Sequence, residues 1–116
     1  MCIRDSIKLV VDNTFAPAPI QYPLELGADI VIHSTTKYIN GHGDVVGGAV
    51  IGSADDIKAI KKYGVTKLCG TTQSPFNSYL ILRGMKTMYL RVKQHCENAM
   101  EVAKYLENRE EVARVL

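Results

Sequence analysis

The chain has 116 residues, of which 47% are hydrophobic and 22% charged, proportions that suit one globular domain with a core. Its net charge of +2 and its lack of a Lys/Arg block argue against nucleic acid as a partner, and no apolar stretch is long enough to cross a membrane. The first six residues do not form a signal peptide, and three widely spaced cysteines form no disulfide framework, so we expect a cytoplasmic location.

Two apolar runs predict strands in the first third of the chain. Residues 7–11 (IKLVV) end at Asp12, and residues 28–33 (ADIVIH) form the second run. Each run is continuously apolar, which is typical of a strand buried on both faces of a parallel sheet. Between them, two prolines mark a loop, and residues 23–26 can form one or two helical turns before Gly27.

The middle of the chain is rich in glycine and predicts a long loop over residues 35–48. A third, short strand is expected at 49–51. Ser53 is then placed to cap a helix over 54–62, whose first turn holds two aspartates. We expect residues 64–73 to be polar and irregular.

The last third predicts a long helical stretch. Ser74 stands at the N-cap and Pro75 at the first helical position. Apolar residues recur at helical spacing to Leu106, and Gly84 is expected to interrupt or bend the helix. The alternation of strands and helices indicates an α/β domain, but so few short strands make a poor sheet alone, so we expect a fragment of a larger chain.

The segment HSTTKYINGHGD, residues 33–44, is the candidate functional site. Lys37 follows a cluster of small hydroxyl residues, after an apolar strand and before a Gly-rich turn. This arrangement can hold a phosphate and present an amine to an aldehyde, so we interpret it as a pyridoxal-phosphate (PLP) site with Lys37 as the Schiff-base lysine. A solvated surface lysine, or a phosphate-binding loop without PLP, would use the same residues.

Ser34 and Thr36 are the candidate phosphate ligands, because hydroxyl groups can donate to phosphate oxygens. The alternative is that these hydroxyls only satisfy the backbone of the loop, and we favour that alternative for Thr35.

Asp12 is the second candidate residue for binding PLP. A carboxylate at the end of a buried strand needs a partner, and the protonated pyridine nitrogen of PLP would be one. The alternative is a turn or N-cap aspartate in the loop that begins there.

Other constellations give weaker signals. His33, His42 and Asp44 lack a zinc-type spacing, so we predict no metal site. The phosphate-binding motifs GxGxxG and GxxxxGK[ST] are absent, which argues against a nucleotide site. Arg83 and Arg91 are interpreted as structural ion-pair residues.

Taken together, several ordered motifs resemble the Cys/Met-metabolism PLP-dependent enzymes. This family includes methionine γ-lyases, cystathionine γ-synthases, cystathionine lyases and O-acylhomoserine sulfhydrylases. The resemblance extends over nearly everything from Lys8 onward, and its motifs are VDNTF at 11–15, PLELGADIV at 23–31, HS at 33–34, TKYINGHGD at 36–44, SPFN at 74–77, LRGMKT at 82–87, Arg91 and HCENA at 95–99.

The resemblance implies a type I PLP fold, with a seven-stranded, mostly parallel sheet flanked by helices. It implies that Lys37 binds the cofactor aldehyde and later moves protons at the substrate, that Asp12 pairs with the pyridine nitrogen, and that Ser34 and Thr36 bind the phosphate. It also implies a homotetramer built as a dimer of dimers that share active sites.

The resemblance further divides the chain into three parts. Residues 1–6 do not match the family motifs and are expected to be a leader from outside the family, such as an artificially joined start. Residues 7–73 correspond to the C-terminal part of the PLP-binding domain, and residues 74–116 to a long helix and the truncated start of the C-terminal domain. Since other parts of the family pattern are missing, we expect no turnover by the isolated 116 residues.

Within the family, the sequence is most similar to methionine γ-lyases, on residues 38–45, 47–48 and 74–77. This predicts a C–S lyase that carries out α,γ-elimination on methionine or a related thioether amino acid. Thr66 and Lys67 stand where those lyases usually carry Lys-Asp, so strict methionine specificity is not expected. The alternatives are γ-replacement on an acylhomoserine, as in cystathionine γ-synthase or O-acylhomoserine sulfhydrylase, and a non-catalytic fragment that only binds PLP or phosphate.

Overall fold

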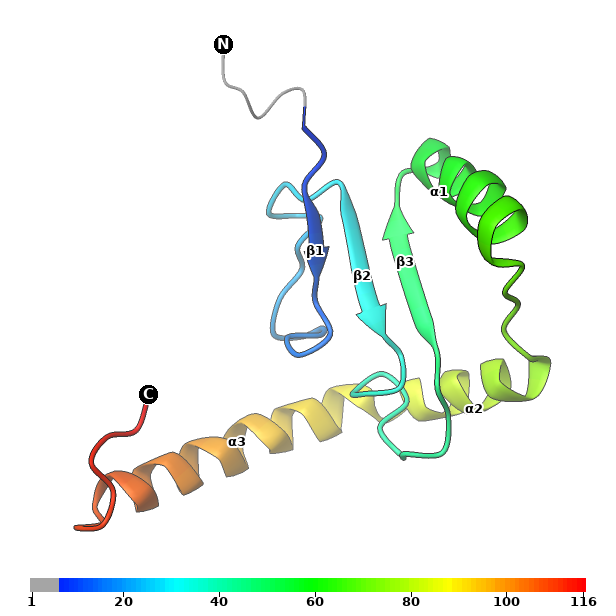
Figure 1. Cartoon of the computed structure of the whole chain (residues 1–116). Coiled ribbons are helices and arrows are strands. Elements are labelled where there is room, and N and C mark those ends of the chain that lie inside the picture. The colour runs from blue at the N-terminus through cyan, green and yellow to red at the C-terminus, as the bar shows by residue number, and fades with distance from the viewer. Residues whose placement is uncertain (1–6) are drawn as a thin grey trace.

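Three short strands form one mixed sheet in the computed structural model, which describes residues 7–116 (Figure 1). β1 (Val10–Asp12), β2 (Ile30–Ser34) and β3 (Gly48–Gly52) lie in that order. β1 pairs with β2 in parallel, and β2 pairs with β3 in antiparallel orientation. The α/β class predicted from the sequence is therefore confirmed, but one of the two strand pairs described in residues 7–116 is antiparallel.

The antiparallel direction of β3 follows from the connection that precedes it. Parallel neighbours need a crossover long enough to return the chain to the starting edge, usually a helix. Residues 35–47 contain no helix and double back at the edge where β2 ends, so Gly48 pairs with Ser34. The prediction of a glycine-rich loop is therefore confirmed, and this loop makes β3 antiparallel to β2.

The first strand is shorter and more exposed than predicted. β1 comprises Val10–Asp12 rather than residues 7–11, and the side chain of Val10 is 48% exposed. A continuous apolar run shows that both faces of a strand are suited to burial, but burial also requires other elements that cover those faces. Within residues 7–116, no element covers both faces of β1, so the expected burial is wrong for this chain.

The helix after Ser53 continues beyond its expected end. α1 (Ala54–Ile60) begins at Ser53, whose hydroxyl accepts the N–H of Asp56, and runs directly into the π-helix η2 (Lys61–Cys69). The irregular stretch predicted from residue 64 is therefore wrong over most of its length. The helical path ends instead at Gly70, which adopts a left-handed φ of 61° and donates its N–H to Val65.

The long helical stretch of the last third has the predicted start and the predicted break. α2 (Pro75–Met85) is capped by the Ser74 hydroxyl, which accepts the N–H of Asn77 at 3.1 Å. α3 (Met88–Glu107) follows after two residues and extends well beyond the sheet (Figure 1). Gly84 is buried just before this break, where its backbone lies against the carbonyl of Asn40.

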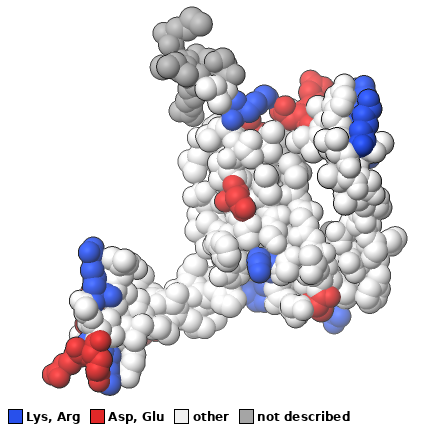
Figure 2. All heavy atoms as spheres, in the orientation of Figure 1, with Lys and Arg blue, Asp and Glu red and all other residues white. Residues whose placement is uncertain are grey.

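The buried residues gather around the loops rather than between the sheet and a helix layer. Within residues 7–116, the buried aliphatic side chains are Val31, Val45 and Val92, and the buried polar ones are Asn13, Thr14, His33, Thr35 and Asn40. The radius of gyration is 18.0 Å, whereas a compact domain of this length has about 13 Å. Much of the sheet face in Figure 2 accordingly carries uncharged side chains that are open to solvent.

Some predictions fall outside what the structure describes. The six-residue leader lies outside the described residues, and the division of the chain at residues 73 and 74 stays a prediction. None of the helices described in residues 7–116 is long and apolar enough to cross a membrane.

The packing of Gly84 gives a prediction for stability. A Cβ at this position would overlap the backbone of Asn40, so Gly84→Ala is expected to lower the free energy of unfolding by about 1–3 kcal/mol. The matched control is Gly64→Ala, where a Cβ meets nothing within 4 Å and alanine favours the helix by about 0.5–1 kcal/mol. Urea unfolding followed by circular dichroism measures both, and equal effects of the two substitutions would contradict the packing.

Candidate active site

Parallel pairing brings Asp12 and Ser34 to the same edge and face of the sheet. The register pairs Asp12 with Ile32, so their side chains share one face, and Ser34, two residues further along β2, lies on it too. Both strands end at this edge (Figure 1). The face around Asp12 and Ile32 is exposed, whereas Val31 and His33 are buried on the opposite face.

Thr14 connects the ends of these two strands. Its hydroxyl accepts the backbone N–H of Ser34 at 2.8 Å, and its own backbone N–H donates to Oδ1 of Asp12 at 3.0 Å. Thr14 is 6% exposed. In the sequence, Thr14 stood out only as part of a motif, although the backbone N–H two residues after a strand-ending aspartate is the typical partner in an Asx turn.

These contacts keep the Asp12 carboxylate ionised. Hydrogen bonds from the Thr14 hydroxyl and then from the Thr14 N–H lower the pKa of Asp12; burial opposes them in part, and nearby His33 adds a smaller lowering effect. Asp12 is thus a turn aspartate, as the alternative interpretation held. Its exposed carboxylate nevertheless remains available at the open face, so the structural and the functional interpretations are compatible.

Lys37 occupies a tight turn directly after β2. Its N–H donates to the carbonyl of Ser34 at 3.2 Å, and its carbonyl accepts the N–H of Gly41 at 2.7 Å. Gly41 has a φ of 71°, a left-handed conformation that closes this turn. The Lys37 side chain is exposed and forms no salt bridge with any carboxylate in residues 7–116.

The hydroxyls of this segment differ in their hydrogen bonding. Thr36 Oγ1 accepts the Gly47 N–H at 3.0 Å and faces the Gly47 carbonyl at 3.3 Å, a long distance for an O–H donor. The Ser34 hydroxyl makes no hydrogen bond within the described residues. Thr35 is buried and its hydroxyl has no partner there, so the expectation that it satisfies the loop backbone is wrong.

The donor set fits a phosphorylated pyridine aldehyde. Lys37 offers a free amine, Ser34 an uncommitted hydroxyl, and Thr36 a hydroxyl proton that only a long contact holds. Asp12 offers an ionised carboxylate that can face a protonated ring nitrogen. All four lie at or directly after the carboxyl ends of β1 and β2, where ligands of α/β sheets bind.

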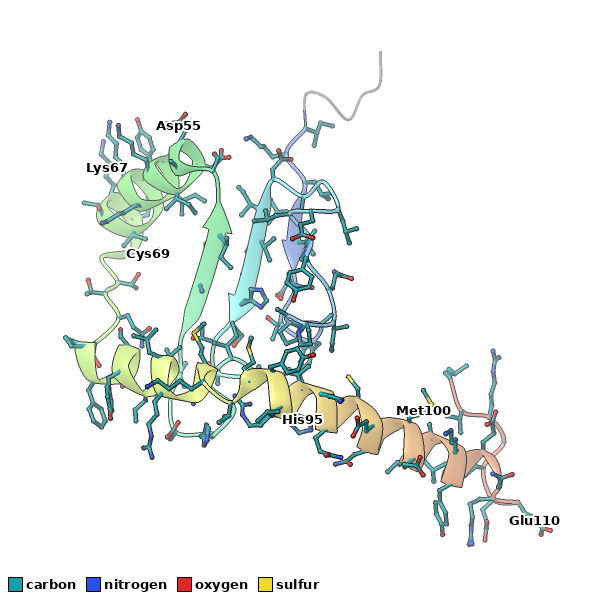
Figure 3. All side chains as sticks on the ribbon, turned by 180° about the vertical axis from the view of Figure 1, so that it is seen from behind. Asp55, Lys67, Cys69, His95, Met100 and Glu110 are labelled. Carbon is teal, nitrogen blue, oxygen red and sulfur yellow. The ribbon has the colours of Figure 1, made fainter. Side chains whose placement is uncertain are left out.

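Arg91 is a residue of this site that the sequence analysis misjudged. It forms no ion pair with a carboxylate in residues 7–116; its guanidinium donates instead to the backbone carbonyls of Tyr38 and Gly84, at 2.9 and 2.8 Å. The ring of Tyr38 also meets His95 of α3 edge-on, with 5.4 Å between the ring centroids. Figure 3 shows His95 on α3 beneath the loops that end β1 and β2. These contacts attach α3 to the turn of Lys37.

The glycine-rich part of the loop is closed by its own side chains. Asn40 donates its amide to Asp44 at 2.6 Å, and its carbonyl contacts Nδ1 of His42 at 2.6 Å. Within residues 7–116, no three His, Cys, Asp or Glu side chains come close enough together to hold a metal ion.

Comparison with known proteins decides the family of this chain. A sequence profile of the Cys/Met metabolism PLP-dependent enzymes matches residues 1–116. The chain belongs to the Cys/Met metabolism PLP-dependent enzyme family. PLP is therefore the cofactor of the family to which it belongs, and the sequence resemblance is confirmed.

Relatives in this family carry several activities. The chain is 53% identical over 112 residues to an L-methionine γ-lyase of Porphyromonas gingivalis and 50% identical over 111 residues to a cystathionine β-lyase of Coxiella burnetii. It is 47% identical over 114 residues to a cystathionine γ-synthase of Mycobacterium leprae. These alignments cover 95–97% of the chain but only 28–29% of each relative, so the chain spans little more than a quarter of their length.

Solved structures of the Cys/Met metabolism family contain the same fold segment. A cystathionine γ-synthase from Xanthomonas oryzae in complex with cystathionine superposes with a TM-score of 0.84 at 44% identity, over 92% of this chain and 27% of that one. A cystathionine γ-lyase from Micromonospora echinospora gives a TM-score of 0.86 at 38% identity, over 92% of this chain and 28% of that one. The small mixed sheet is thus part of a larger fold in those proteins.

The buried histidine behind the site gives a pH prediction. Burial lowers the pKa of His33 below its ordinary value of about 6.5, and Asp12 opposes this only in part. As the pH falls through about 6.5, His33 takes up a proton in the unfolded chain before it does so in the folded chain. The free energy of unfolding is therefore expected to decrease over this step.

The substitution His33→Gln should flatten this dependence, because the titrating group is then absent. His42→Gln is the control, since His42 is exposed in the loop and should leave the dependence in place. Urea unfolding at several pH values measures the slope for each variant. Equal slopes for His33→Gln and the unaltered chain would contradict the prediction.

Proposed function

We propose that this chain carries the cofactor-binding lysine of a PLP-dependent carbon–sulfur enzyme, and that Lys37 is that lysine. The observation that supports this best is the turn after β2, which presents an unpaired amine at the sheet edge where the Asp12 carboxylate also lies. Family membership supports PLP as the cofactor, and the geometry supports Lys37 and Asp12 as residues that would hold it.

Asp12 is proposed to hold a proton on the pyridine nitrogen. Its carboxylate is exposed on the open face, and its lowered pKa keeps it negative over the physiological pH range. A fixed negative charge at the ring nitrogen favours the protonated ring, which is the form that withdraws electrons from a bound amino acid. Thr14 would orient this carboxylate through its hydrogen bonds.

Ser34 and Thr36 are proposed to bind the phosphate. The Ser34 hydroxyl is uncommitted, and the Thr36 hydroxyl can turn from the Gly47 carbonyl, which it faces only at 3.3 Å, toward a phosphate oxygen. Thr36 would remain anchored while doing so, because its oxygen still accepts the Gly47 N–H. Because Asp12 and Ile32 are exposed, the ring would lie over this face, between the phosphate and the carboxylate.

The proposed reaction is α,γ-elimination from methionine or a related thioether amino acid. When bound, PLP supplies an electron sink for a negative charge at the substrate Cα. Lys37 would release the cofactor to the substrate amine and then act as the base that removes the Cα proton. With methionine and water, the overall products would be methanethiol, 2-oxobutanoate and ammonia.

γ-Replacement on an acylhomoserine is a second candidate reaction, supported by the 47% identity with a cystathionine γ-synthase. The identities with lyases and with the synthase differ by only a few percent over this segment. The segment therefore carries chemistry that both reactions share, namely cofactor binding and proton transfer at Cα. Following the family resemblance, we also propose a homotetramer built from dimers, which analytical ultracentrifugation of the full gene product would test.

The role of Lys37 is tested by covalent trapping. The full gene product is mixed with PLP and reduced with borohydride, and the labelled peptide is identified by mass spectrometry. We expect the label on Lys37, with exposed lysines such as Lys93 as internal standards for non-specific reaction. Lys37→Arg keeps the charge but should lose the label and lower turnover at least about 10²-fold. A folded protein labelled no more at Lys37 than at Lys93 would refute the proposal.

Asp12→Asn separates attachment of the cofactor from its activation. The trapped label on Lys37 should persist, because the amine and the phosphate ligands remain. Turnover should fall by about 10²-fold or more, because the negative charge at the ring nitrogen is lost. The assay measures 2-oxobutanoate from methionine, and cystathionine from O-succinylhomoserine plus cysteine, so it also ranks elimination against replacement. Unchanged turnover would argue against this role of Asp12.

A further inference from the structure

Arg91 forms an unusually complete set of contacts for a side chain with no acidic partner in residues 7–116. Its Nε donates to the Thr87 hydroxyl at 3.0 Å, and its two terminal nitrogens donate to the carbonyls of Tyr38 at 2.9 Å and Gly84 at 2.8 Å. Two longer contacts, both of 3.4 Å, reach the carbonyls of Ile39 and Asn40. All of these acceptors are neutral, so the guanidinium organises backbone rather than neutralising a charge.

The acceptors on the loop are the three residues that directly follow Lys37. The opposite side of the same turn is closed by the Lys37 carbonyl, which accepts the Gly41 N–H at 2.7 Å. The path of the backbone at Lys37 is therefore fixed at its own carbonyl and at the next three carbonyls. Without Arg91, those three carbonyls would lose their protein donor on this side.

The backbone around Arg91 is shaped to admit the guanidinium. A Cβ at Gly41 would overlap the terminal nitrogens and the central carbon of the Arg91 side chain. Gly41 also adopts a left-handed φ of 71°, so two separate requirements favour glycine there. His95, one helical turn beyond Arg91, supports the same segment by contacting the Tyr38 ring (Figure 3).

We infer that Arg91 is a positioning residue for Lys37: from α3 it fixes the turn that presents the lysine amine to the cofactor. This inference rests on the proposed function, because it assigns Arg91 to the lysine that binds PLP. A lysine at position 91 could not replace it, since a single ammonium group cannot reach the four carbonyls and the hydroxyl that the guanidinium contacts. The inference differs from a general role in folding, because the contacts converge on one turn.

Two glycines of the same loop provide a matched test. Gly41 and Gly43 have nearly equal left-handed φ values, 71° and 69°, so alanine strains the backbone at both sites to a similar degree. A Cβ at Gly43 meets nothing within 4 Å, whereas one at Gly41 displaces the Arg91 guanidinium. Any difference between Gly41→Ala and Gly43→Ala therefore reports on the Arg91 contacts.

The experiment compares both variants in the full gene product. The rate of borohydride-trapped labelling at Lys37 is measured at rising PLP concentration, and amide hydrogen exchange is followed over residues 38–41. For Gly41→Ala we expect the maximal labelling rate to fall about tenfold below that of Gly43→Ala, with faster exchange of these amides. Both variants are labelled at a temperature well below their thermal midpoints, where a purely structural role of Arg91 would leave their labelling rates equal.

The outcomes separate the inference from the proposed function. Equal labelling and equal exchange in the two glycine variants would overturn the role of Arg91 while leaving Lys37 as the cofactor lysine. Absence of label on Lys37 in the unaltered protein would overturn both. If Gly41→Ala does not fold, Arg91→Lys is compared with Arg83→Lys, because Arg83 is an exposed arginine of α2. Labelling of Arg91→Lys at the rate of Arg83→Lys would then reject the inference.

Discussion

The parallel pairing of β1 with β2 is the constraint on which the candidate site depends. It places the end of the Asp12 strand beside the end of the strand that leads into Lys37, in a register that puts Asp12 and Ser34 on one face. A shift of one residue would turn one of these two side chains to the buried face. The Thr14 hydroxyl fixes this register at its end, because it accepts the N–H of Ser34 while its own backbone binds Asp12.

The interior of this segment is polar for a physical reason. Its buried side chains include Asn13, Thr14, Thr35 and Asn40, which serve loops whose backbone groups need partners away from water. Hydrophobic side chains on the sheet remain exposed, such as Val10 and Ile51. Burial is therefore concentrated in the loops at the carboxyl ends of β1 and β2. Most of the apolar surface of the sheet is not covered by other residues within 7–116.

Sequence reasoning found the features that local chemistry determines. The strand ends, the loop around Lys37, the Ser74 cap and the break after Gly84 all follow from turn residues, capping and side-chain periodicity. It failed over residues 64–69, which were expected to be irregular but continue the helical path as η2 without burying a residue. It also failed where long-range contacts decide: Arg91 was interpreted as a structural ion-pair residue, yet three of its acceptors lie more than fifty positions away on the loop. Every residue has a backbone carbonyl, so no pattern of residue types could predict which carbonyls accept hydrogen bonds from Arg91.

The separation of Arg91 from Tyr38 also bears on how the site comes into existence during synthesis. The contact joins residues 53 positions apart, so the β1–β2 pairing can form well before α3 has left the ribosome. The turn that carries Lys37 acquires these donors only when the first turn of α3, which holds Arg91, has formed and docked. A nascent chain can thus hold the paired ends of β1 and β2 while the Lys37 turn still lacks these donors. The proposed cofactor lysine would then reach its final geometry only after a helix made much later in the chain has docked.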